Sequence, residues 1–185
     1  MDITIQELDV RNIQDAGQCD NAFVVNSKLI LHLEHNILRY TVVPVPPYQK
    51  RYPPGDIDFA AYLAQPDKVV FLGYLNRQLA GQIVVRKNWN AYASITDLAV
   101  ATHFRRQGVG HTLMQHAMAW AQKKQLPGIT LETQNNNVAA CRLYERCGFR
   151  LGGFDEYFYK GINPDTDEIA LFWYLAFNAE SAQTA

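Results

Sequence analysis

The amino-acid sequence predicts a mixed α/β (α+β) fold, a sheet flanked by helices, from two observations. In the first half of the chain, short runs rich in β-branched and aromatic residues are separated by turn residues, as is typical of antiparallel strands. In the second half, strand-like runs alternate with two helical patterns. Strands that come first and later alternate with helices indicate a mixed sheet. We expect a single domain over residues 1–177, divided into 1–85 and 86–177, and a flexible tail over 178–185.

Composition narrows the class of protein. The chain has 185 residues, of which 48% are hydrophobic, and this is enough apolar material for one core. A net charge of −1 without a basic stripe argues against a nucleic-acid partner. The sequence has neither a membrane-spanning apolar run nor the basic start and apolar run of a signal peptide. Three sparse cysteines suit a reduced, cytoplasmic protein, and the histidine spacing predicts no metal site.

The N-terminal quarter is predicted to be largely extended. Ile3–Val10 alternates well enough for a first strand, and Asn12–Cys19 suits a short helix. Residues 28–34 and 37–45 are rich in β-forming residues and predict two extended segments, with a helical piece as the alternative. Prolines then crowd one stretch, which predicts either a surface loop bordering a site or a plain connector: Pro44, Pro46, Pro47, Pro53 and Pro54.

The chain from residue 56 to residue 100 predicts a helix and three strands. Asp56–Ala64 has the apolar spacing of a helix. Lys68–Leu75 and Leu79–Arg86 predict a hairpin that turns at residues 76–78. A second turn over residues 87–90 then leads into a central strand, Tyr92–Val100.

A glycine-bearing loop follows that strand and opens a long helix. The helix shows an apolar stripe at helical spacing: Val109, Leu113, Ala117, Trp120 and Ala121. Free backbone N–H groups and the helix dipole make such a start a phosphate site, with Gly108 and Gly110 allowing close approach. Arg105 and Arg106 add charge. The alternative is a plain helix entry, and the dinucleotide fingerprint fails because Leu113 stands where its third glycine belongs.

The last third predicts strand, helix and two strands. Gly128–Thr133 is a strand pattern, and the asparagines at 135–137 offer a cap for a helix over Val138–Cys147. Gly148 suits the C-terminal end of that helix. Phe149–Lys160 and Glu168–Phe177 predict the last two strands.

Three motifs in this region resemble the core motifs of the GNAT superfamily of N-acetyltransferases. They are Asp97-Leu98-Ala99-Val100, Arg105-x-x-Gly108-x-Gly110, and Asn137-x-x-Ala140-x-x-x-Tyr144-x-x-x-Gly148-Phe149. Their order and spacing are specific when all three occur together. The resemblance implies a central, mostly antiparallel sheet that splays where acetyl-CoA, the implied cofactor, enters.

The resemblance also assigns residues to the cofactor. Backbone groups of Leu98 and Val100 would pair with the pantetheine arm, the 105–110 loop would hold the diphosphate, and Asn137 would reach the cofactor from the second helix. The alternative for Leu98 and Val100 is a place in the core, and the alternative for Asn137 is a helix cap. The implied cofactor-binding residues are Leu98, Ala99, Val100, Arg105, Arg106, Gln107, Gly108, Val109, Gly110, Asn137, Ala140 and Tyr144.

Three residues are candidates for the chemistry. Attack of an amine on a thioester expels a thiolate, and a phenol such as Tyr144, the family's usual residue there, can protonate it. Its alternative is a half-buried tyrosine with a satisfied hydroxyl. The attacking amine must lose a proton, and Asp97 or Glu132 is the candidate base. Either carboxylate could instead bind the substrate's charge or pair with an arginine.

A wider resemblance, over residues 86–177, is to streptothricin acetyltransferases, which N-acetylate the β-lysine part of that antibiotic. It rests on residues 86–93, 131–137, 140–144, 147–149 and 171–175. It implies a small polycationic amine as the acceptor, with residues 1–85 building part of its site. Acids and aromatic faces recognise cations, and the candidates are Trp89, Tyr92, Asp97, Glu132, Asp155 and Glu156, with Tyr157 as a further aromatic.

Two other functions stay open. One is a GNAT enzyme that acts on another amine: a polyamine, an aminoglycoside or a protein N-terminus. The other is a non-catalytic acyl-CoA sensor that keeps the cofactor groove without turnover. The apolar last strand suits a homodimer interface and equally a place in the core.

Overall fold

The computed structural model describes residues 2–51 and 57–177, and these form two compact units. The first unit holds the described residues of the ranges 1–22, 51–129 and 176–185, and the second holds 23–50 and 130–175. The predicted flexible tail, 178–185, lies outside the described residues. The single domain over residues 1–177 stays a prediction.

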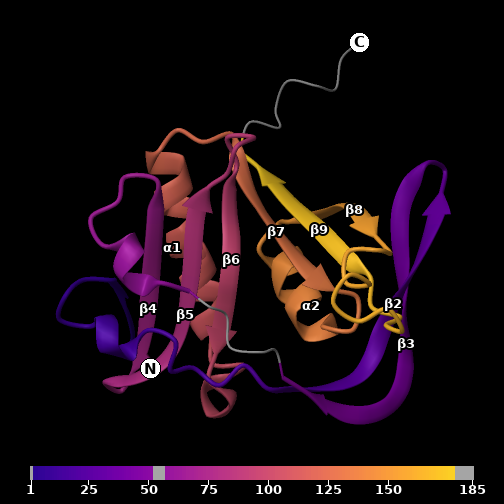
Figure 1. The fold of residues 1–185 in the computed structure, drawn as a ribbon, viewed down its shortest axis with the longest axis horizontal. Helices are drawn as coiled ribbons and strands as arrows, with labels where there is room; N and C mark the ends of the chain where they lie inside the picture. The colour runs from indigo at the N-terminus through magenta and orange to yellow at the C-terminus, as the bar shows by residue number, and fades with distance from the viewer. Residues whose placement is uncertain (1, 52–56, 178–185) are drawn as a thin grey trace. The chain divides into compact units, whose positions relative to one another are not determined.

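The first unit is a four-stranded antiparallel arrangement with one α-helix (Figure 1). Its strands follow the order β1-β4-β5-β6. The helix α1 packs against all four of these strands. The bounds are β1 Ile3–Glu7, β4 Lys68–Leu75, β5 Gln78–Lys87, β6 Ala93–Val100 and α1 Val109–Lys123.

The core of the first unit lies on both faces of β4 and β5, which explains why these strands are almost continuously apolar. On one face, Val109, Leu113, Ala117 and Ala121 of the predicted stripe are buried, while Trp120 is half-buried. On the other, Val70, Leu72 and Val84 join a cluster with the 3-10 helices at Ile13–Asp15 and Phe59–Tyr62. The hairpin predicted at residues 76–78 is confirmed.

Gly81 of β5 lies close to the backbone of β6 and to side chains of α1, and its replacement tests that packing. A Cβ there would lie 2.8 Å from Ala99 O, 3.0 Å from Leu113 Cδ1 and 3.1 Å from Val109 Cγ1. The backbone oxygen cannot move aside cheaply, so Gly81→Ala should lower the free energy of unfolding by about 1–3 kcal/mol. Urea denaturation followed by tryptophan fluorescence measures this. Gly153→Ala is the control, because a Cβ at Gly153 meets nothing within 4 Å. Equal loss in both variants would contradict the tight contact.

The second unit contains a long hairpin, three further strands and a helix (Figure 1). β7 lies beside β9, which pairs antiparallel with β8, and the second unit contains β7 from Thr130 onward. The hairpin β2–β3 is attached to the end of β7, since Leu29 N donates to Asn135 O at 2.8 Å. Leu29, Leu171 and Trp173 are fully buried in this unit. The bounds are β2 Phe23–Glu34, β3 Ile37–Lys50, β7 Gly128–Gln134, α2 Val138–Arg146, β8 Arg150–Asp155 and β9 Ala170–Ala176.

In the N-terminal half, the two predicted extended segments are strands, whereas the predicted proline loop and the predicted first helix were wrong. The two extended segments are confirmed, and they turn at His35 and Asn36, which have positive φ. The proline loop was wrong for residues 44–47, which belong to β3, because a two-stranded ribbon tolerates missing N–H donors at its edge. Pro53 and Pro54 lie outside the described residues. The helix predicted at 12–19 is only a 3-10 turn, ended by Gly17 at φ 79°.

The remaining differences concern the ends of elements. The helix predicted over 56–64 shrinks to a 3-10 turn at Phe59–Tyr62 in the described residues, capped by Asp58. β1 stops at Glu7, and β8 stops at Asp155, because the Asp155 side chain accepts the Tyr157 N–H at 2.7 Å and starts a turn. The second helix is confirmed, with Gly148 at φ 88° after its last turn.

Candidate functional site

The start of α1 has a glycine at its N-cap, as the sequence predicts. Gly108 is the N-cap residue with φ 91°, in the left-handed region, and has no side chain to cap the first turn. Its carbonyl accepts the Thr112 N–H at 2.9 Å, so the helix begins regularly. Gly108 therefore offers the first turn no side-chain cap, and the helix dipole favours an anion there.

The two arginines of this loop, Arg105 and Arg106, differ in exposure and in hydrogen bonding. Arg105 is half-buried, and its Nε donates to Val100 O at 2.9 Å, which ties the loop back to the end of β6. Arg106 is exposed and has a positive φ of 61°. Gln107 also braces the loop, because its Nε2 donates to His103 O at 2.9 Å. Arg106 is thus the guanidinium that this geometry leaves pointing into solvent, where it can meet a phosphate.

Asp97, one of the two candidate bases, is held by a glutamine that the sequence analysis missed. Gln82 Nε2 donates to Asp97 Oδ2 at 2.6 Å, and Gln82 Oε1 accepts the Gly17 N–H at 2.7 Å. Burial raises the pKa of Asp97, and the hydrogen bond from Gln82 opposes that rise. The only sequence signal was a lone amide inside the apolar run from Ala80 to Val85.

Asp97 also affects a thiol beside it. Burial, and secondly the negative charge of Asp97, raises the pKa of Cys19 to about 11. Cys19 is therefore a protonated thiol near neutral pH rather than a nucleophilic thiolate.

Glu132, the other candidate base, is held in the second unit by a tyrosine. The side chain of Glu132 is half-buried on β7 and accepts a hydrogen bond from the Tyr159 hydroxyl. Burial raises the pKa of Glu132, and the bond from Tyr159 opposes that rise. Sequence reasoning missed Tyr159 because nothing in its local pattern marks it. In the described residues, neither Asp97 nor Glu132 forms the arginine pair that was one alternative.

The three asparagines between β7 and α2 have separate structural roles. Asn137 is the N-cap of α2, its Oδ1 accepting the Ala140 N–H at 3.3 Å, so the cap alternative is present. Asn135 braces the hairpin, with Nδ2 donating to Leu29 O at 3.3 Å. Asn136 Nδ2 donates to Glu168 Oε1 at 3.0 Å, and its own buried Oδ1 has no hydrogen-bond partner among the described residues. A capping oxygen still has a lone pair for a ligand, so the cap does not exclude a cofactor role for Asn137.

Tyr144 is almost fully buried, with 6% of its surface exposed. Its ring packs against Phe149 and Trp173, with centroid distances of 6.2 and 6.1 Å. The helix position and these contacts fix the ring in one place. A fixed phenol suits both the packing alternative and a proton donor.

The candidate acceptor residues are spread over both units. In the first unit, Trp89 lies in the turn before β6 and is 93% exposed, Tyr92 is half-buried, and Asp97 lies in the middle of β6. In the second unit, Asp155 and Glu156 lie at the end of β8, where Glu156 is exposed. The Tyr157 ring already has the Lys160 ammonium 4.7 Å from its centroid, which reduces its use as a face for a foreign cation.

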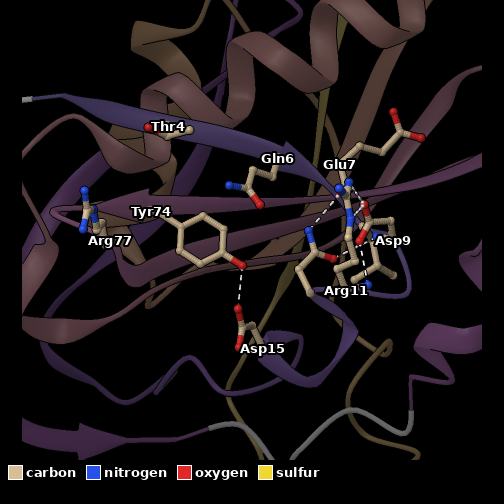
Figure 2. Close-up of a pocket in the computed structure, with 10 residues that line it drawn as sticks. Thr4, Gln6, Glu7, Asp9, Arg11, Asp15, Tyr74 and Arg77 are labelled. Carbon is tan, nitrogen blue, oxygen red and sulfur yellow. Dashed lines mark hydrogen bonds and ion pairs between the residues drawn. The ribbon is translucent and has the colours of Figure 1, made fainter.

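An open groove of about 860 Å³ lies elsewhere in the first unit, beside β1 and β4 (Figure 2). Its polar groups are largely paired with one another: Tyr74 donates to Asp15 Oδ2 at 2.6 Å, and Arg11 forms an ion pair with Asp9. None of the site residues that the sequence predicts lines this groove. Within the described ranges, no cluster of His, Cys, Asp and Glu could hold a metal ion.

Comparison with known proteins adds independent findings. Residues 34–149 match the profile described as "Acetyltransferase (GNAT) family". Streptothricin acetyltransferase A of Bacillus subtilis (strain 168) is 38% identical over 167 residues, which cover 90% of this chain and 95% of that protein. A streptothricin acetyltransferase of Escherichia coli is 36% identical and covers 91% of this chain and 93% of its own length.

A solved structure is similar over the same extent. The crystal structure of a Bacillus anthracis str. Ames protein assigned as a streptothricin acetyltransferase, in complex with acetyl coenzyme A, has a TM-score of 0.88 and 43% identity. The match covers 96% of this chain and 99% of that one. The mixed α/β fold with mostly antiparallel strands is therefore confirmed.

Proposed function

This chain belongs to the acetyltransferase (GNAT) family, and from that premise we propose that it transfers the acetyl group of acetyl-CoA to a primary amine of a streptothricin-type antibiotic. The observation that supports this acceptor is the identity of 36–38% to two streptothricin acetyltransferases over nine tenths of the chain. N-acetylation removes a positive charge from the drug and would confer resistance.

The residues of the first unit fit the cofactor's diphosphate. Gly108 adds no side-chain cap at the start of α1, and Arg106 adds an exposed guanidinium in the same loop. Amides of a helix start and an arginine are the donors that phosphate oxygens prefer. Acetyl-CoA, when bound, supplies an activated acetyl thioester. Asn137, Ala140 and Tyr144 are the proposed contributors from the second unit.

The proposed chemistry needs one base and one acid. An alkyl ammonium with a pKa near 10.4 is neutral in about one molecule in a few thousand at pH 7, so a base must remove its proton. Burial raises the pKa of both Asp97 and Glu132, which makes each a better proton acceptor than an exposed carboxylate. Tyr144 would give its phenolic proton to the departing sulfur.

The acceptor is tested by expressing the chain in a streptothricin-susceptible bacterium. We expect growth in the drug and a mass gain of about 42 daltons on the recovered antibiotic, the increment of one acetyl transfer. A thiol-release assay with purified protein and a panel of polyamines, aminoglycosides and peptides is the matched measurement. If the bacterium is not protected but the purified protein acetylates another amine, the protein is an acetyltransferase with a different acceptor. If it acetylates none of the amines, the result favours an acyl-CoA sensor.

Partners and location complete the proposal. We infer a small-molecule acceptor, a cytoplasmic location consistent with cysteines that form no disulfide in the described residues, and neither a nucleic-acid nor a membrane partner. The helices within the described ranges are all too short or too polar to cross a membrane. A homodimer stays open, although Ala170, Leu171 and Trp173 of the last strand are buried and so serve the core.

A further inference from the structure

The hydrogen bond between Tyr159 and Glu132 joins two parts of the second unit that are far apart in the chain. Glu132 lies on β7, and Tyr159 lies 27 residues later in the segment between β8 and β9. The bond therefore depends on the folded unit rather than on local sequence. Nothing in a structural core requires a carboxylate at this half-buried position, where burial penalises its charge.

We propose that Tyr159 is a positioning residue, whose hydroxyl holds the Glu132 carboxylate ionised and in one orientation so that it takes the proton of the acceptor's ammonium group. This inference rests on the proposed function. It selects Glu132, rather than Asp97, as the base and adds a residue to which no role had been assigned.

Tyr159 is itself held rigidly enough for this task. Its carbonyl accepts the N–H groups of Ile162 and Asn163 at 3.0 Å each, which closes a turn around it. The Phe158 ring stacks edge-on against Tyr159 at 5.2 Å and against Phe172 of β9 at 5.8 Å. A donor fixed by its own turn and by packed rings keeps its direction without an added entropic cost at each turnover.

A phenol is a better partner for a base than an arginine would be. A guanidinium holds a carboxylate ionised so strongly that its basicity falls, whereas a neutral donor orients it and leaves it basic. Two causes act on the pKa of Glu132, burial that raises it and the Tyr159 bond that lowers it, and Tyr159 is the titratable group that faces it. The bond uses Oε1, and the carboxylate retains Oε2 to accept a proton.

The proton and electron pairs balance in this scheme. The ammonium proton moves to Glu132 Oε2, directly or through one water, and the freed nitrogen lone pair forms the C–N bond. The C–S bond breaks, its electron pair stays on sulfur, and the sulfur receives the Tyr144 proton. The nitrogen of the adduct loses its second proton, which restores the Tyr144 phenol directly or through water, and Glu132 releases its proton to solvent.

Tyr159→Phe tests the inference, because it removes one hydroxyl and keeps the ring. We expect the apparent pKa of the acidic limb of its pH profile to rise by about 1, since a donor that favours the ionised form is lost, so that kcat/KM falls about tenfold at pH values below that limb. Activity should recover toward wild type at higher pH, with unchanged affinity for acetyl-CoA.

Tyr40→Phe is the matched control. Tyr40 also donates its hydroxyl to a carboxylate of the second unit, that of Glu145, which has no proposed part in the reaction. Tyr40→Phe loses a comparable hydrogen bond away from Glu132, so it should melt at a slightly lower temperature and keep the wild-type pH profile. Tyr159→Gln, which retains an N–H donor, should return the acidic limb part of the way to its wild-type position.

Three outcomes would overturn the inference in distinguishable ways. An acidic limb that stays in place in Tyr159→Phe, while Glu132→Gln is inactive, removes the positioning role and leaves the proposed enzyme intact. Wild-type rates in Glu132→Gln remove Glu132 as the base. If Tyr159→Phe does not fold, carbon-13 titration of Glu132 in the wild-type protein decides, because its pKa must coincide with the acidic limb.

Discussion

Tyr144→Phe is expected to lower kcat by roughly ten- to a thousand-fold while affinity for acetyl-CoA changes little. The reason is that the departing thiolate loses its proton donor, an interaction made only as the C–S bond breaks. The ring, which packs against Phe149 and Trp173, is kept in this variant. Steady-state kinetics with a thiol reagent, alongside calorimetry for the cofactor, measures the two effects separately.

The control for this experiment is stability. Phenylalanine preserves the buried ring contacts, so the melting temperature should stay close to that of the wild-type protein. A large drop in melting temperature would mean that the hydroxyl supports the fold, and the kinetic loss could then not be assigned to proton transfer. Wild-type kcat in a stable variant would return Tyr144 to the packing role that its burial also allows.

Gly108→Trp is expected to abolish binding of acetyl-CoA. The wild-type protein should bind it at micromolar strength, and a hundredfold excess over Kd should add about 2.7 kcal/mol to the free energy of unfolding, seen as a higher melting temperature. An indole at the N-cap of α1 would occupy the space over the first-turn amides. It would also force a non-glycine side chain into φ 91°, which costs about 1–2 kcal/mol.

Two variants separate bulk from backbone strain. Gly108→Ala has the same unfavourable φ, and its Cβ would lie no closer than 3.6 Å to Ile3 Cδ1, so it should lose stability but still bind. Gly161→Trp adds the same bulk at a glycine with nothing within 4 Å, and should bind normally. Unchanged calorimetric binding in Gly108→Trp would remove this loop as the diphosphate site.

Periodic and local signals predicted the parts of the fold that depend on neighbouring residues. The stripe from Val109 to Ala121 predicted the buried face of α1, and the turn at Asn76 and Arg77 predicted the β4–β5 hairpin. Gly148 predicted the end of α2. Each of these signals lies within a few residues of the structure that it specifies.

The missed features depend on register between distant segments. Gln82 reaches Asp97 only because β5 and β6 pair with Ala99 opposite Gln82, and Tyr159 reaches Glu132 across 27 residues. Prolines misled the prediction for residues 44–47, because their turn preference is only a local tendency: Pro44 pairs with Ser27, and residues 45–47 pass through a register shift of the ribbon. The cofactor-binding, catalytic and acceptor-binding roles of individual residues, which were assigned by resemblance, stay predictions until the variants above are measured.

Those prolines in β3 have a consequence for how the protein behaves at high concentration. The hairpin is a sheet of two strands, so β3 has one edge without a partner strand in that sheet. N–H groups of successive strand residues point to opposite sides, so Pro46 and Pro47 together guarantee a missing donor on whichever side is open. A strand from another molecule cannot form a continuous ladder there, and this part of the ribbon resists edge-to-edge aggregation.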